Sequence, residues 1–443
     1  MTSRLPTSLH RTLSRYKPGD LRISPSRLLD TLHHSCQWGA AHRYGPQPTQ
    51  TGMARLSLDA NDAKVRAWMA REAEAVGCRT VVDGVGNQFF IRPGDRADAA
   101  PTAMGSHMDT QPTGGRYDGI LGVVAGLEVM RTLHHRGLRT RYPLALVNWT
   151  NEEGARFPRS LAGSAVWAET LPLDQAWSLK DVNDPSITLR DALVEARMLG
   201  THCDHRSLPL AAHFELHIEQ GPILEQRDKR IGVVLGGQAY KWFDVEISGM
   251  ECHTGSTPYE YRADALLCAS RIIVEATLMA KEVGALASTG IIEARPGSVN
   301  TCPGTVRMTI DVRHARSDVV ADLCQRIRAR SAVLGRGTGD RHCTVRWDQT
   351  FESDAATFDP ACIEAIRDVA VATVGSDRVL DMYSGAGHDS FSTSLRCPTG
   401  MIFVPSRDGI SHNPSEFTEP EHCAQGAQVL LDAVLLYDSK RVA

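Results

Sequence analysis

The sequence of 443 residues contains no apolar run that approaches the roughly 20 residues of a membrane-spanning helix. Its eleven cysteines include no Cys-x-x-Cys pair, so a structural zinc site built from four cysteines has no support. Internal repeats are also absent. The net charge is only −4, which gives no reason to expect nucleic acid or an acidic membrane as a partner. These absences indicate an ordinary globular protein with free thiols in a reducing compartment.

The N-terminal segment has no acidic residue before Asp20, although it carries four basic ones. Three leucines spaced four apart give residues 1–19 a weak resemblance to a mitochondrial targeting peptide. We favour the alternative, which is a disordered basic tail over residues 1–22 and a cytoplasmic protein.

Strand-like apolar runs alternate with helical patterns through most of the chain. Strands are expected at 102–105, 144–149 and 213–218, and a long helical pattern follows the first of them. This alternation predicts an α/β domain with a mainly parallel central sheet. We assign residues 23–237 and 353–443 to that domain.

The pattern changes between residues 238 and 352, where strands and helices come in the order β-α-β-β-α-β. That order is typical of a ferredoxin-like unit. Because the earlier pattern resumes after this segment, we expect it to form a separate domain inserted into the first.

Residues 105–119 bring an imidazole and two carboxylates to the point where a strand gives way to a helix. His107 and Asp109 end the strand, and Asp118 follows a Gly/Pro-rich turn. In α/β folds, ligand and metal sites gather at such points. Further His and acidic residues follow other predicted strands: Glu152 and Glu153, His217 and Glu219, and His412.

Each of these groups alone has a plain structural explanation, since adjacent glutamates are ordinarily a solvated turn. Together they favour a metal site, because two carboxylates at the end of an apolar strand need positive charge nearby. A mixed His, Asp and Glu set suits zinc, and also manganese, cobalt or nickel. Two such ions that share a carboxylate can acidify one water, and an unliganded carboxylate nearby can take its proton.

Several motifs together resemble the carbamoyl-amino-acid amidohydrolase branch of the aminoacylase-type dizinc metallopeptidase superfamily. They are GSHMDTQPTGGRYDG, NEEGARF, HIEQGPILE, SVNTCPG, SGAGHDS and PSRDGISHN. The resemblance runs from about Leu28 to the C-terminus. It is greatest to the fungal-type β-alanine synthases (β-ureidopropionases), through the segments 51–56, 238–242 and 437–442. It implies a zinc-peptidase-like catalytic domain and an inserted lid and dimerisation domain.

The resemblance implies a site for two divalent ions, with zinc as the first choice. His107 and His217 would bind one ion. Glu153 and His412 would bind the other, and Asp118 would bridge the two.

The resemblance also assigns roles around the ions. Glu152 would be the general base, and Asp109 would orient His107. His253, in the inserted domain, would polarise the scissile carbonyl.

A last set of residues would recognise the substrate. Asn300 and Arg313, also in the inserted domain, would hold its carboxylate, and Gln220 would contact its ureido group. His388 would line the pocket without a firm role.

The implied reaction is hydrolysis of N-carbamoyl-β-alanine to β-alanine, carbon dioxide and ammonia, as in pyrimidine breakdown. An N-carbamoyl-L-α-amino acid, allantoate or an N-acyl compound is an alternative substrate. A peptidase and a catalytically inactive binding protein are further alternatives. The expected assembly is a homodimer formed through the inserted domain.

Overall fold

The computed structural model describes residues 11–12, 16–201, 204–337 and 341–441. The chain divides into two compact units. Unit 1 comprises the chain up to Leu235 and from Thr357 onward, and unit 2 comprises Gly236–Ala356. None of the helices in the described ranges has the length and apolarity needed to cross a membrane.

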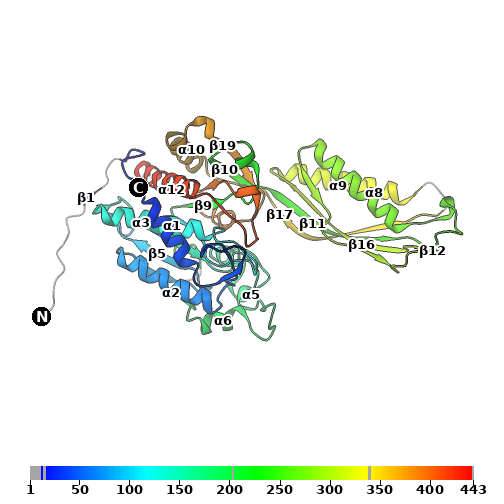
Figure 1. Cartoon of the computed structure of the whole chain (residues 1–443), viewed down its shortest axis with the longest axis horizontal. Helices are drawn as coiled ribbons and strands as arrows, with labels where there is room; N and C mark the ends of the chain where they lie inside the picture. The colour runs from blue at the N-terminus through cyan, green and yellow to red at the C-terminus, as the bar shows by residue number, and fades with distance from the viewer. Residues whose placement is uncertain (1–10, 13–15, 202–203, 338–340, 442–443) are drawn as a thin grey trace. The chain divides into compact units, whose positions relative to one another are not determined.

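The described part of unit 1 is built on a nine-stranded sheet (Figure 1). Its middle is parallel and runs in the order β20 (Thr399–Val404), β9 (Ala212–Ile218), β6 (Thr102–His107) and β8 (Leu144–Trp149). The strands β5, β4 and β10 beside it are antiparallel to their neighbours. The sheet is therefore mixed, and the prediction of a mainly parallel sheet holds only for its centre. The flanking strands are β4 (Arg79–Val82), β5 (Gln88–Arg92), β10 (Ile231–Gly237), β18 (Ala356–Thr357) and β19 (Val379–Ser384).

Five helices form the main apolar core with one face of this sheet. In β9, Phe214, Leu216 and Ile218 belong to that core, so His217 points to the opposite face, as the alternation of the sequence predicts. The helices are α1 (Pro25–Ser35), α2 (Ala60–Ala75), α3 (Ile120–His135), α10 (Pro360–Val374) and α12 (Pro420–Lys440).

The remaining elements of unit 1 are short. They are β1 (Arg11–Thr12), β2 (Ala40–Arg43), β3 (Thr51–Met53), β7 (Leu138–Arg139), α4 (Ala162–Trp167), α5 (Leu173–Trp177), α6 (Leu189–Glu195), α7 (Ile223–Gln226), η2 (Ser376–Arg378), α11 (Asp389–Thr393) and η3 (Arg407–Gly409).

The disordered tail predicted over residues 1–22 is wrong for its last part. Tyr16 and Leu21 are buried, and the Tyr16 hydroxyl donates a hydrogen bond to Asp432 of α12. The Gln428 side chain also donates to the Leu21 carbonyl oxygen at 3.0 Å. The charge pattern of the segment does not indicate these contacts, because the apolar side chains between the basic ones pack against α12, far along the sequence. Residues 1–10 and 13–15 lie outside the described residues.

Unit 2 is an antiparallel sheet covered by two helices. The predicted order β-α-β-β-α-β is present in β11, α8, β14, β16, α9 and β17, and the short strands β12, β13 and β15 lie between them in the chain. The strand order is β13-β16-β11-β17, and β14 also pairs with β16. Two short strands, β12 and β15, form a separate ladder. The elements are β11 (Ala239–Ser248), β12 (Cys252–His253), η1 (Tyr259–Tyr261), α8 (Ala265–Glu282), β13 (Leu286–Ser288), β14 (Ile292–Arg295), β15 (Thr301–Cys302), β16 (Thr305–His314), α9 (Ser317–Gly335) and β17 (Thr344–Ser353).

Replacing Gly122 with alanine should push α3 away from β9. A Cβ atom at Gly122 would lie 2.3 Å from the backbone oxygen of Leu216, which cannot move aside. We expect Gly122→Ala to lower the free energy of unfolding by about 1–3 kcal/mol, measured by denaturant titration.

The matched control is Gly126→Ala, one turn later on the same helix. There the nearest atom belongs to the flexible end of the Leu146 side chain, and alanine favours helix more than glycine does. Equal stability losses in the two variants would contradict the close approach of α3 to β9.

Candidate metal centre

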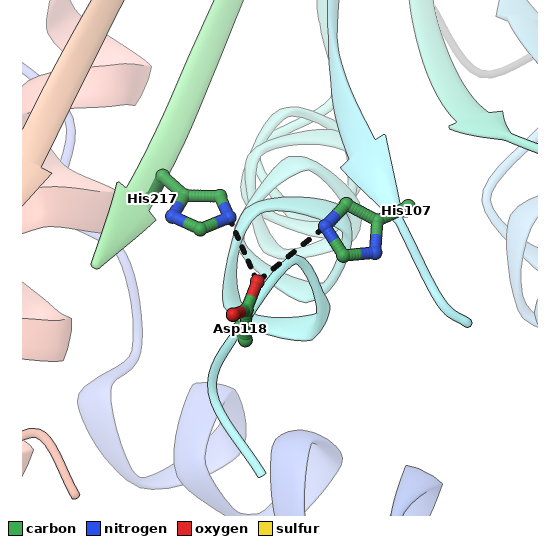
Figure 2. A group of neighbouring side chains, drawn as sticks. All are labelled: His107, Asp118 and His217. Carbon is green, nitrogen blue, oxygen red and sulfur yellow. Dashed lines mark ion pairs between the residues drawn. The ribbon is translucent and has the colours of Figure 1, made fainter. Parts of the chain in front are cut away.

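Three of the predicted ligands come from strand ends and from the start of α3 in unit 1. His107 is the last residue of β6, His217 lies near the end of β9, and Asp118 closely precedes α3. Asp118 Oδ1 lies 3.5 Å from His107 Nε2 and 3.1 Å from His217 Nε2. Figure 2 shows both imidazoles turned toward this one carboxylate oxygen.

The second oxygen of Asp118 faces a different pair of side chains. Asp118 Oδ2 lies 3.4 Å from His412 Nε2, and the same nitrogen lies 3.4 Å from Glu153 Oε2. One carboxylate thus contributes to two groups of potential ligands, each with its donor atoms within 4.8 Å of one another. This is the arrangement that a bridging ligand requires.

The hydrogen bonds of His107 and His217 show which ring nitrogen carries the proton and which one is available to a metal ion. Their Nδ1 atoms lie 2.9 and 2.8 Å from the backbone carbonyl oxygens of Asp109 and Ile218, which can only accept a hydrogen bond. Nδ1 therefore carries the proton, and in the neutral ring Nε2 presents a lone pair to Asp118. His107 Nε2 is buried without a hydrogen-bond partner among the described residues. The His217 Nε2 lone pair accepts the backbone N–H of Gly119 at 3.2 Å. The buried Nε2 of His107 has no such donor in the described part of the chain and faces carboxylates, so the residues present fit a bound metal ion.

The pKa shifts at this centre have the same cause. Burial alone would raise the pKa of the Asp118 carboxyl, but the imidazoles of His107, His217 and His412 outweigh it and hold that pKa well below its usual range. The contact with Asp118 raises the pKa of His412 to about 9. Burial and the neighbouring Asp118 raise the pKa of Glu153 to about 7. Bound protons thus supply positive charge that divalent cations would otherwise supply.

Glu152, the predicted base, is buried beside this ligand set. Its Oε2 lies 3.4 Å from His107 Nε2. Burial raises the pKa of its carboxyl well above the usual range, and although His107 opposes this, nearby carboxylates add to it.

Asp109 contacts His107 in a different way from the predicted one. Its backbone oxygen accepts the Nδ1 proton, whereas its carboxylate Oδ1 lies 4.0 Å from Nδ1. The carboxylate instead accepts weak hydrogen bonds from the backbone N–H groups of Glu152 and Glu153, at 3.4 and 3.3 Å. Its position therefore supports the turn that carries the two glutamates.

Gln220 and His388, predicted to contact substrate, also lie at this centre. Gln220 Nε2 donates to Asp118 Oδ2 at 2.7 Å, and its Oε1 is buried with no partner among the described residues. His388 is buried with its ring 4.4 Å from that of His217, and its Nε2 lies 3.0 Å from Ser384 Oγ. Burial and the nearby His217 lower the pKa of His388 well below its usual value.

The other predicted substrate residues lie in unit 2. His253 Nδ1 accepts the backbone N–H groups of Gly255 and Ser256, at 3.1 and 3.2 Å, so the proton of the neutral ring is on Nε2. The N–H of Thr254 donates to the Asn300 carbonyl oxygen at 2.9 Å, which brings His253 and Asn300 together.

Arg313 lies near the end of β16 in the five-stranded sheet, whereas His253 belongs to the separate β12–β15 ladder. Its Nη2 lies 2.7 Å from Asp311 Oδ2, and its guanidinium carbon lies 4.8 Å from the ring centre of Tyr240. The strand β16 starts at Thr305, close after β15, and Arg313 lies roughly 25 Å farther along it at the usual rise per residue. Within unit 2, Arg313 is therefore far from His253 and Asn300.

Two buried acidic residues at the centre of unit 1 were missed by the sequence analysis. Glu416 accepts hydrogen bonds from the backbone of Tyr117 and Asp118. Glu215 accepts the hydroxyl protons of Ser106 and Ser390, each at 2.7 Å. The strand alternation that places Glu215 beside His217 was a usable signal, whereas the partners of Glu416 are nearly 300 positions away.

Comparisons with known proteins agree with this geometry. The model of "Peptidase family M20/M25/M40" matches residues 103–436. An N-carbamoyl-L-amino-acid amidohydrolase of Rhizobium meliloti is 37% identical over 421 residues, which cover 94% of this chain and 98% of that protein. An allantoate amidohydrolase of Bacillus subtilis is 30% identical over 413 residues, which cover 93% of this chain and 96% of that one.

A solved structure is similar over nearly the whole chain. The crystal structure of an amidase of the hydantoinase/carbamoylase family from Burkholderia multivorans superposes with a TM-score of 0.89 at 39% identity. It covers 95% of this chain and 100% of that one. Together with the ligand set described above, these matches show that the chain belongs to peptidase family M20/M25/M40, among its homologues of N-carbamoyl-L-amino-acid amidohydrolases.

Proposed function

We propose that this protein hydrolyses the carbamoyl amide of a linear ureido acid with the help of two divalent metal ions. The observation that carries the proposal is the position of Asp118, whose two oxygens face separate groups of ligands while Glu152 lies alongside. The reaction adds water to the carbamoyl carbon and releases carbon dioxide, ammonia and the free amino acid.

The ligand chemistry supports two ions of the zinc type. His107, Asp118 and His217 would hold one ion, and Asp118, Glu153 and His412 the other. Such mixed nitrogen and oxygen donors suit zinc, with manganese, cobalt or nickel as alternatives. When bound, the ions supply Lewis-acid activation of the water nucleophile and of the scissile carbonyl.

The residues of the chain move the protons and position the substrate. Glu152 takes the proton of the attacking water at a carboxylate oxygen and passes it to the leaving nitrogen. His253 offers its Nε2 proton to the developing oxyanion. Asn300 and Arg313 bind the substrate carboxylate, and the unpartnered Gln220 Oε1 accepts from the ureido N–H groups.

Two substrate classes have support. Relatives named as N-carbamoyl-L-amino-acid amidohydrolases favour N-carbamoyl-L-α-amino acids. The resemblance to fungal-type β-alanine synthases through segments 51–56 and 238–242 favours N-carbamoyl-β-alanine.

The positions of the substrate residues within unit 2 support a homodimer. His253 and Asn300 lie roughly 25 Å from Arg313, farther than one small ureido acid can reach. If all three contact the substrate, two copies of unit 2 must contribute to each active site. Unit 2 then acts as a lid and as the dimerisation domain.

An exposed apolar surface on unit 2 supports the same proposal. On α8, Val274 and Leu278 are more than half exposed, and Leu286 of β13 and Ile292 of β14 are also exposed. Both β13 and β14 pair with β16 on one side and with no other strand among the described residues. An apolar helix stripe and an unpaired strand edge suit a symmetric interface.

The Glu152→Gln variant tests the base. We expect hydrolysis to fall about 10²–10⁴-fold while both metal ions stay bound, because the amide cannot take a proton. Glu364→Gln, on the exposed side of α10, is the control and should keep full activity. Hydrolysis that survives Glu152→Gln would contradict the role of this residue.

A substrate panel tests the reaction. Metal-depleted protein is reconstituted with zinc or manganese, the bound metal is measured, and ammonia release is followed. The substrates are N-carbamoyl-β-alanine, N-carbamoyl-L-α-amino acids, allantoate and unmodified dipeptides. We expect turnover of a ureido acid and none of the dipeptides. Cleavage of dipeptides alone would indicate a peptidase, and binding without turnover would indicate an inactive binding protein.

Subunit mixing tests the shared site. His253→Ala and Arg313→Ala should each be inactive, since each lacks one substrate contact. The two variants are unfolded and refolded together, so that about half of the dimers are heterodimers. If His253 acts across the interface, each heterodimer contains one intact site of two. Activity should therefore return to about a quarter of the wild-type value. No recovery, with heterodimers present by mass spectrometry, would place both residues in the same subunit's site.

A further inference from the structure

Glu416 connects the two loops that carry Asp118 and His412. It is buried, with an exposed fraction of 1%. Its Oε1 accepts the backbone N–H groups of Tyr117 and Asp118, both at 3.0 Å. Its Oε2 accepts the hydroxyl proton of Ser411 at 2.9 Å. One carboxylate thus anchors the two chain segments that carry Asp118 and His412, both proposed ligands of the second ion.

The backbone at His412 needs such an anchor. His412 has φ +52°, in the left-handed region that is unfavourable for a residue with a side chain. Its two sides are held by Glu416, through the side-chain bond from Ser411 and through the Glu416 N–H, which donates to the Asn413 carbonyl oxygen at 3.0 Å. Strained residues persist where the surrounding contacts determine their conformation.

Ser411 links the same network to the bridging carboxylate. Its hydroxyl oxygen lies 3.1 Å from Asp118 Oδ2, the oxygen that faces His412. The Ser411 hydroxyl has one proton and lies within hydrogen-bond distance of both carboxylates, so it can donate to either Asp118 or Glu416. Ser411 thus lies between the Asp118 carboxylate and Glu416, next to His412 in the chain, and Gln220 Nε2 donates to the same oxygen of Asp118 at 2.7 Å.

The Asp118 loop is shaped to admit the Glu416 side chain. A Cβ atom at Gly115 would lie 2.2 Å from Glu416 Oε1 and 2.3 Å from its Cδ. Any side chain at this position would displace the carboxylate, which explains the need for glycine there. The fit leaves Glu416 little freedom to move.

We propose that Glu416 is a positioning residue that holds Asp118 and His412 in the geometry needed to bind the second metal ion. It acts through three hydrogen bonds and contacts neither ion nor substrate. The inference rests on the two-ion centre of the proposed function and adds a residue that the centre depends on.

The experiment measures zinc binding by metal-depleted protein, with competition against a chelating dye. For Glu416→Ala we expect the affinity of one of two ions to fall about 10–100-fold, with the other little changed. Glu416→Gln should stay within a few-fold of wild type, because its amide oxygen can accept both N–H groups and its amide nitrogen can donate to Ser411. Ser411→Ala, which removes one bond only, should weaken the same ion by a smaller factor and provides the test if Glu416→Ala does not fold.

The matched control is Asp83→Ala, which removes another buried carboxylate. Asp83 accepts the backbone N–H groups of Val85 and Asn87 at 3.0 and 2.8 Å and the Asn87 side-chain amide at 2.7 Å. It should lose comparable stability and keep both ions.

Three results would overturn the inference. They are wild-type affinity for both ions in Glu416→Ala and Ser411→Ala, an equal loss in Asp83→Ala, and a loss in Glu416→Gln as large as in Glu416→Ala. If the wild-type protein itself fails to bind two ions, the proposed function fails separately, and the variants need not be compared.

Discussion

The centre of unit 1 depends on one unfavourable contact. The Nε2 atoms of His107 and His217 converge on one oxygen of Asp118 in a buried space, and the other oxygen of Asp118 meets His412. A neutral imidazole nitrogen and a carboxylate oxygen repel each other at this distance unless a proton or a metal cation lies between them. The raised pKa of His412 and of the Glu153 carboxyl shows the proton-bound form of that requirement.

The scaffold makes this contact possible by where its strands end. The parallel strands β6, β8 and β9 finish at one edge of the sheet, and α3 begins beside them. The close approach of α3 to β9 at Gly122 brings Asp118 to His217. Groups that are unfavourable together are thus held by packing that is favourable elsewhere, which is common at functional sites.

Much of the fold and of the candidate ligand set could be predicted, because the sequence patterns that indicate them are local. Apolar runs such as 144–149 mark strands, and the longer strands and helices of unit 2 have the order that periodicity predicts. Asp109 shows where local reasoning stops: its carboxylate was expected to orient His107, but its backbone oxygen does so. The tail prediction failed for a similar reason, because Tyr16 is buried by α12, over 400 positions later.

The sequence by itself determined the residue types of the centre and the strands that end there, because alternation and glycine-rich turns are properties of neighbouring residues. Only the tertiary structure decided which oxygen of Asp118 faces which imidazole, and which nitrogen of each histidine carries the proton. It also decided that Glu416 joins two loops, and that His253 and Arg313 lie far apart within unit 2. These features depend on contacts between distant parts of the chain, and spacing along the sequence carries no information about such contacts.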